Sequence, residues 1–144
     1  MNRDEEGLDR FVSAQARDFE TALSEIQGGR KRSHWMWYIF PQIRGLGMSS
    51  TAQYYGIRDL DEARDYLLHP VLGANLRRIC GALLALQGSD ATALLGYPDD
   101  LKLYSCMTLF EAAAPEEPIF GRVLDKYYRG SRDRWTIQLL AERS

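Results

Sequence analysis

The chain has 144 residues, close to the usual size of one domain, and 45% of them are hydrophobic while 26% are charged. The formal net charge of −2 argues against nucleic-acid binding, because such proteins usually carry a strongly basic face. The two cysteines, Cys80 and Cys106, lie in apolar helical patterns without a Cys/His cluster, which favours buried thiols over a disulfide and argues against a structural zinc site. No apolar run approaches 18 residues and the first nine residues are polar and acidic, so we expect a cytoplasmic protein that is not embedded in a membrane.

The first predicted helix follows a short N-terminal segment. Apolar residues recur every three or four positions from Leu8 to Ile26, and Gly28 and Gly29 close the pattern. We expect residues 1–7 to form a flexible tail. Gln15 falls within the apolar stripe, where an unpaired amide is costly. We therefore expect Gln15 to form a hydrogen bond with the His34–Gln42 region.

The second predicted helix is short and aromatic. It runs over residues 34–40, with Ser33 as its cap and Pro41 as its end. Its expected buried face consists of Trp35, Met36, Ile39 and Phe40. A further short helix follows, which Ser49 or Ser50 caps.

Helix signals continue to the end of the chain. Asp59 with Glu62 reads as a capping box, and Pro70 suits the first position of the next helix. Later helices are predicted to begin at Asp90, at Asp99 or Asp100, at Ile119, and at Ser131 or Asp133. No segment alternates with period two. The sequence thus predicts one compact all-α domain over residues 1–144, with about seven or eight short helices that do not form a regular up-down bundle.

The segment around the aromatic helix holds two candidate sites. Three cations, Arg30, Lys31 and Arg32, could hold phosphates, or they could form an ordinary solvated turn. His34 beside Trp35 and Trp37 could carry a proton or stack on a base. The alternative is an aromatic core with a hydrogen-bonded histidine. The other histidine, His69, precedes a proline and is expected at the start of a helix.

A glycine loop forms the third candidate site. Gln42 and Arg44 precede Gly45-Leu46-Gly47, and Ser49 follows. A glycine loop that leads into a helix N-terminus exposes backbone N–H groups that bind anions. The alternative is a turn glycine followed by an ordinary N-cap serine.

A row of polar residues forms the fourth candidate site. Asp99, Lys102, Ser105 and Thr108 are spaced three apart, so they share one face of a helix whose other face is apolar. Such a row could hold a polar ligand, or it could be an exposed polar face.

Several motifs resemble one known family. They are Gly-Arg-Lys-x-x-His-Trp-Met-Trp-x-x-Phe-Pro-Gln-x-x-Gly-Leu-Gly-x-Ser from Gly29, Asp100-x-Lys-Leu-x-Ser-x-Met-Thr-Leu-Phe110, and Asp133-x-x-Thr136. They are similar to the signature of the bacterial domain-of-unknown-function family DUF1810. The resemblance implies a compact multihelical domain and no established activity.

Two further labels come with this resemblance. Some members of the family are labelled calpastatin, but this chain lacks the Pro/Lys-rich repeats of such an inhibitor. A more distant likeness to the NADAR (YbiA-like) group would imply a role in ADP-ribose and NAD metabolism.

These observations favour a protein with a single pocket for an anionic, nucleotide-like or ADP-ribose-like small molecule, either as a binding protein or as an enzyme. We expect the aromatic helix, the Gln42–Ser49 loop and the Lys102–Thr108 row to form its walls, without a metal or a resident cofactor. The candidate ligand-binding residues are Gln15, Arg30, Lys31, His34, Trp37, Gln42, Arg44, Ser49, Lys102, Ser105, Thr108 and Asp133. The alternative is a non-catalytic protein-interaction domain that uses the basic segment Arg30–Arg32. The sequence leaves the oligomeric state open.

Overall fold

The fold is all-α, as expected. The computed structural model describes residues 3–143, and side chains from residue 7 onward, and this part of the chain forms nine helices and no strand. The helices are α1 (Arg3–Gln27), α2 (Met36–Ile39), α3 (Ser50–Tyr54), α4 (Leu60–Leu68), α5 (Leu72–Ala85), α6 (Ala91–Leu95), α7 (Asp99–Ala113), α8 (Ile119–Tyr128) and α9 (Arg134–Glu142). Because α1 begins at Arg3, residues 3–7 of the expected tail are helical, while residues 1 and 2 lie outside the described part.

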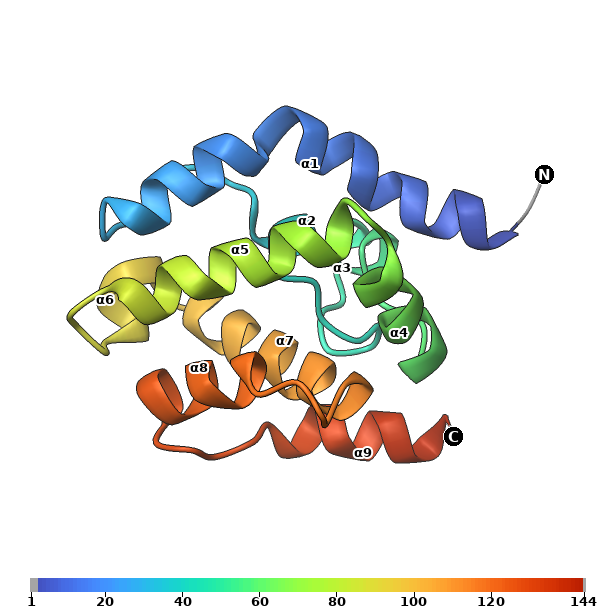
Figure 1. The fold of residues 1–144 in the computed structure, drawn as a ribbon. Coiled ribbons are helices and arrows are strands. Elements are labelled where there is room, and N and C mark those ends of the chain that lie inside the picture. Colours follow the sequence, from blue (N-terminus) through green and yellow to red (C-terminus); the bar gives the residue numbers. More distant parts are fainter. Residues whose placement is uncertain (1–2, 144) are drawn as a thin grey trace.

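Helix α7 occupies the centre of the arrangement. It packs against α4, α6, α8 and α9, while α1 covers α5 and α2 on another side of the molecule (Figure 1). Side chains around most of the circumference of α7 are buried, which is why its sequence has no single apolar stripe. These crossings confirm that the helices do not form a regular up-down bundle. Among the described helices, none is both long and apolar enough to cross a bilayer.

A chain of aromatic rings joins the helices through the core. Tyr66 of α4 lies 5.3 Å from the ring of Phe11 in α1 and 5.1 Å from that of Phe110 in α7, between ring centroids. Phe110 in turn lies 5.9 Å from Phe120 of α8. All four rings are fully buried. The expected buried face of the aromatic segment, with Trp35 at its start, is also confirmed.

Four predicted helix caps are present. Ser49, Asp59, Asp90 and Asp133 each accept a hydrogen bond from a backbone N–H in the first turn of α3, α4, α6 and α9. These bonds satisfy donors that have no partner within the helix. His69 lies in the turn that leads into α5, in line with the expected place at a helix entry, and its Nδ1 accepts hydrogen bonds from the N–H groups of Val71 and Leu72.

Two predicted helix starts are displaced. The Ser33 cap is wrong, because α2 begins only at Met36 and the Ser33 hydroxyl donates to Glu25 of α1. Helix α5 begins at Leu72 rather than at Pro70, after the turn that His69 closes.

Backbone hydrogen bonds join the two ends of the segment between α2 and α4. Ile43 and Ile57 form an isolated parallel bridge, in which the Ile57 N–H donates to the Gln42 carbonyl and the Arg44 N–H to the Ile57 carbonyl, both at 2.8 Å. The glycine loop and α3 lie between these two points, so the bridge fixes where the loop leaves the core.

Candidate functional site

The basic segment is divided between the interior and the surface. The Lys31 Nζ lies 2.9 Å from Asp99 Oδ2 and 5.1 Å from the centroid of the Trp35 ring. Arg30 and Arg32, in contrast, are exposed. Only two of the three cations are therefore available to a partner on the surface.

Asp99 joins this segment to α7. Its Oδ1 lies 3.3 Å from the Nζ of Lys102, which in turn sits 4.8 Å from the centroid of the Trp37 ring. One carboxylate thus holds two lysines, and each lysine covers the face of one tryptophan. Cation–π contacts of this kind contribute about 0.5–2 kcal/mol.

Glu25 of α1 holds the start of the aromatic segment. Its carboxylate accepts hydrogen bonds from the N–H groups of Arg32 and Ser33, from the Ser33 hydroxyl and from the Trp35 indole, at 2.6–2.9 Å. Partial burial opposes its ionisation, but the four donors outweigh burial and lower the pKa of Glu25 to about 2. The residues before α2 are therefore fixed by a charge that periodicity in the sequence does not reveal.

Gln15 has a structural partner for each end of its amide. Its Nε2 donates to the Tyr38 carbonyl at 2.7 Å and to the Tyr66 hydroxyl at 2.8 Å, and its Oε1 accepts from Asn75 at 3.0 Å. The expected bond to the His34–Gln42 region is confirmed. Because the side chain is only 3% exposed, Gln15 lies in the core.

The polar row on α7 is mostly buried, which corrects its interpretation as one face above an apolar helix. The Ser105 Oγ lies 2.7 Å from Asp133 Oδ2, to which the Thr136 hydroxyl also donates at 2.6 Å. The Asp133 N–H donates to the Thr108 hydroxyl at 3.0 Å. These groups satisfy one another and fasten α9 to α7.

The remaining candidate residues are dispersed. His34 and Arg44 are exposed, and the side chain of Gln42 is partly buried beside the Ile43–Ile57 bridge. Ser49 is also exposed and caps α3. The structure therefore brings Ser105, Thr108 and Asp133 into one cluster and Lys31, Trp37 and Lys102 into a second cluster.

A cleft lies between the glycine loop and the helices α7 and α9. We call it the α7–α9 cleft. Its main part has a volume of about 510 Å³ and is lined by Leu46, Leu101, Tyr104, Ser105, Arg132, Asp133, Arg134 and Trp135. A continuation of about 430 Å³, which we call the Gly45 end, shares Leu46 and Trp135 and adds Gly45, Gln138 and Leu139. The loop and the α7 row thus contribute to the walls, whereas the lining includes no residue of the aromatic helix.

Four lining residues with a charged or aromatic side chain, Tyr104, Arg132, Arg134 and Trp135, were missed by sequence reasoning. Trp135 is 56% exposed, and the Arg134 guanidinium carbon lies 5.1 Å from the centroid of its ring. Arg132 forms an ion pair with Glu111 of α7. Tyr104 is held by the neighbouring Tyr128 ring, 4.7 Å away between centroids. The signal for this site was the run Arg132-Asp133-Arg134-Trp135, of which only Asp133 was predicted as a ligand-binding residue.

Comparison with known proteins identifies the family of this chain. The fold is a compact multihelical domain with a cleft beside its last helix. The model of the family described as "Protein of unknown function (DUF1810)" matches residues 5–140, so the chain belongs to the DUF1810 family.

One solved structure is similar along nearly the whole chain. It is the crystal structure of the conserved hypothetical protein Rv1873 from Mycobacterium tuberculosis, with 48% sequence identity and a TM-score of 0.91, covering 93% of this chain and 96% of that one. No curated protein matches the chain. The likeness to the NADAR group stays a prediction.

Proposed function

We propose that the chain binds an anionic small molecule with an aromatic ring, of about the size of a nucleotide, in the α7–α9 cleft. The observation that carries the proposal is the exposed Trp135, with Arg134 over its face, in the wall of a cleft of about 510 Å³. Ligand pockets commonly have volumes of about 300–1,000 Å³.

The chemistry of the lining supports this ligand class. An aromatic ring such as a base stacks on an exposed tryptophan with about 1–3 kcal/mol. Arg134 forms no ion pair with a described residue, so its guanidinium is able to pair with an anionic group of the ligand. ADP-ribose, the ligand class implied by the NADAR likeness, combines both features.

Calorimetric titration with AMP and with ADP-ribose tests the proposal. We expect Trp135→Ala and Arg134→Gln each to weaken binding about tenfold, as the loss of one stacking or charged contact predicts. Ile137→Ala removes another exposed apolar side chain of α9, and Arg122→Gln removes an exposed cation of α8, so both serve as matched controls. Wild-type protein that binds neither compound below about 1 mM, or a Trp135→Ala variant that binds like wild type, would refute the proposal.

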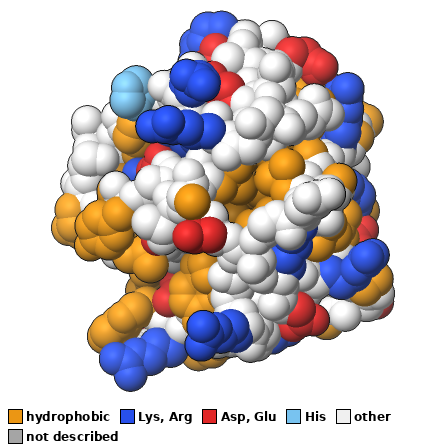
Figure 2. Space-filling model, turned by 90° about the vertical axis from the view of Figure 1, so that its left-hand side faces the viewer, with side chains coloured by type: hydrophobic (Ala, Val, Ile, Leu, Met, Phe, Trp, Pro, Cys, Tyr) orange, Lys and Arg blue, Asp and Glu red, His pale blue; other side chains and the backbone are white. Residues whose placement is uncertain are grey.

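A second candidate function is the docking of an acidic protein segment. Figure 2 looks onto the end of the molecule where α1 and α5 end, and hydrophobic side chains gather there in a hollow. The hollow has a volume of about 200 Å³, and its lining includes Leu86, Leu94, Tyr127 and Gly29, which the exposed Arg30 follows in the chain. We infer that it accepts one apolar side chain of an acidic peptide whose carboxylates meet Arg30 and Arg32.

Fluorescence polarisation with a labelled Glu-Glu-Leu-Glu-Glu peptide tests this second function. We expect salt-sensitive binding that the double change Arg30→Gln and Arg32→Gln weakens and Arg122→Gln does not. Equal affinities for all three proteins would show that the basic segment has no docking role.

A further inference from the structure

The guanidinium group of Arg143 lies directly over Gly45 at one end of the cleft. Gly45 has a φ of +112°, and a Cβ built on it would come within 2.9 Å of the Arg143 Nη2 and 3.6 Å of Leu139. A side chain at position 45 would therefore be strained by the backbone and would displace the arginine. Glycine at this position allows Arg143, just past the end of α9, to approach the loop.

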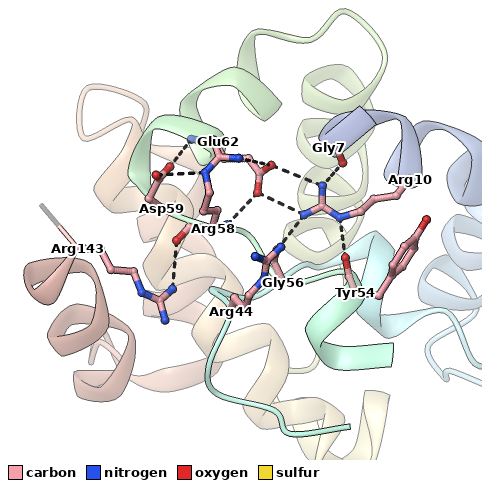
Figure 3. A network of polar contacts seen from close by, with 9 residues as sticks. All are labelled: Gly7, Arg10, Arg44, Tyr54, Gly56, Arg58, Asp59, Glu62 and Arg143. Atoms are coloured by element: carbon pink, nitrogen blue, oxygen red, sulfur yellow. Dashed lines mark hydrogen bonds and ion pairs between the residues drawn. The ribbon is translucent and has the colours of Figure 1, made fainter. Parts of the chain in front are cut away.

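Arg44 and Arg143 are oriented by neutral backbone groups. Arg44 donates to the Gly56 carbonyl at 3.2 Å, and Arg143 donates to the Arg58 carbonyl at 3.1 Å (Figure 3). Both carbonyls belong to the short segment that the Ile43–Ile57 bridge holds in place. The two side chains thus reach the same segment, at the residues on either side of Ile57 (Figure 3).

The other arginines of this network differ because carboxylates neutralise them. Arg10, only 7% exposed, pairs with Glu62 at 3.3 Å, and Arg58 pairs with Asp59 and Glu62. Neither Arg44 nor Arg143 forms an ion pair with a described residue, although both are exposed. Since an arginine has five N–H donors, most donors of these two side chains remain available to a ligand.

We propose that Arg44 and Arg143 form a phosphate-binding subsite at the Gly45 end of the α7–α9 cleft. Two guanidinium groups beside a side-chain-free loop residue match the several acceptor oxygens and the double charge of a phosphate group. The proposal rests on the proposed function, because Gly45, over which the Arg143 guanidinium lies, also lines this end of the cleft together with Leu46, Trp135 and Leu139.

The subsite also sets the direction in which the ligand lies. At the other end of the cleft, Arg132 is neutralised by Glu111, and Arg134 is stacked on Trp135. Arg134 is a single cation without an ion pair to a described residue, whereas Arg44 and Arg143 are two such cations near Gly45. A phosphate monoester of an aromatic compound, such as a mononucleotide, therefore places its ring on Trp135 and its phosphate against Arg44 and Arg143.

Titration of ¹⁵N-labelled protein with inorganic phosphate, at constant ionic strength, tests the subsite by NMR. We expect saturable shifts of the Gly45 amide and of the Nε–H signals of Arg44 and Arg143. Arg44→Gln and Arg143→Gln should each weaken phosphate binding about tenfold, Arg44→Lys should restore part of it through charge alone, and Arg122→Gln should leave it unchanged. Arg143 lies outside α9, so Arg143→Gln tests the subsite even if Arg44→Gln perturbs the loop. Shifts that do not saturate, or equal affinities in the Gln variants and wild type, would overturn the proposal.

Titrations with AMP and adenosine separate this proposal from the proposed function. If both inferences hold, AMP binds more tightly than adenosine, and Arg44→Gln removes that advantage. If AMP shifts the Trp135 indole signal with the same affinity in wild type and in both Gln variants, the subsite is refuted while the cleft function stands. If phosphate binds at Gly45 but neither AMP nor adenosine shifts the Trp135 signal, the cleft function is refuted while the subsite stands.

Discussion

Replacing Glu25 by glutamine should destabilise the fold with little change in the size of the side chain. The carboxylate accepts four hydrogen bonds from the segment before α2, and one of them comes from the indole of the buried Trp35. A glutamine side chain has a single acceptor oxygen and carries no charge. The N–H groups of Arg32, Ser33 and Trp35 all donate to Oε1, and the Ser33 hydroxyl donates to Oε2. The amide therefore offers the three N–H groups one uncharged acceptor and presents an NH₂ donor, in place of an acceptor, to the Ser33 hydroxyl.

The pKa of Glu25 gives the size of the expected loss of stability. The value falls from 4.5 to about 2 on folding, which corresponds to roughly 3 kcal/mol at about 1.36 kcal/mol per pKa unit. This figure is an upper limit, because solvent screens a partly exposed side chain. Since the pKa is lower in the folded state, the stabilisation is complete above pH 4.5 and is lost as the pH falls toward 2.

Urea unfolding followed by circular dichroism measures this effect. We expect Glu25→Gln to be less stable than wild type by about 2–3 kcal/mol near neutral pH, and we expect this gap to narrow as the pH falls from about 5 to about 2. Glu116→Gln, which removes an exposed carboxylate, should follow wild type. A gap below about 0.5 kcal/mol at neutral pH, or a gap of constant size across the acid range, would contradict the reasoning.

Four further predictions concern the buried core and the contacts of Lys102. Trp35→Ala should lower stability by about 3–5 kcal/mol in chemical denaturation, because the ring is only 1% exposed. Gln15→Leu should cost about 2–3 kcal/mol in the same assay, since it leaves buried partners such as the Tyr38 carbonyl without a donor. Lys102→Ala should lower stability by about 1 kcal/mol through loss of its contacts with Asp99 and Trp37, and calorimetry should find AMP binding unchanged. Cys80 and Cys106 should resist alkylation until the protein unfolds, as mass spectrometry can follow, because complete burial raises the pKa of both thiols.

Local signals in the sequence predicted most of the fold. The helix over residues 8–26 and the caps at Ser49, Asp90 and Asp133 depend on side chains within a few positions of the backbone groups that they satisfy. Gln15 was predictable because an amide in an apolar stripe requires a partner.

Contacts between residues that are distant in the sequence could not be predicted from such local signals. Serine is a residue type typical of a helix cap, but the Ser33 hydroxyl donates to Glu25, which belongs to another helix, α1. Ser105 and Thr108 have the spacing of an exposed face, yet Asp133 buries them against α9. The cleft was predicted only in part, because spacing within one helix contains no information about which distant segment packs beside it.

The Ile43–Ile57 bridge also has a consequence for motion. The bridge closes a segment over residues 44–56 whose helix, α3, buries none of its residues. Leu46 and Tyr55 of this segment are only partly buried against the core. Opening the segment therefore exposes less apolar surface than unfolding the whole chain and costs less free energy than global unfolding. We expect its amide protons to exchange with solvent much faster than those of the buried α7. On the timescale of hydrogen exchange, the cleft therefore has one persistent wall, formed by α7, and one wall, formed by the glycine loop, that opens many times while the core stays closed.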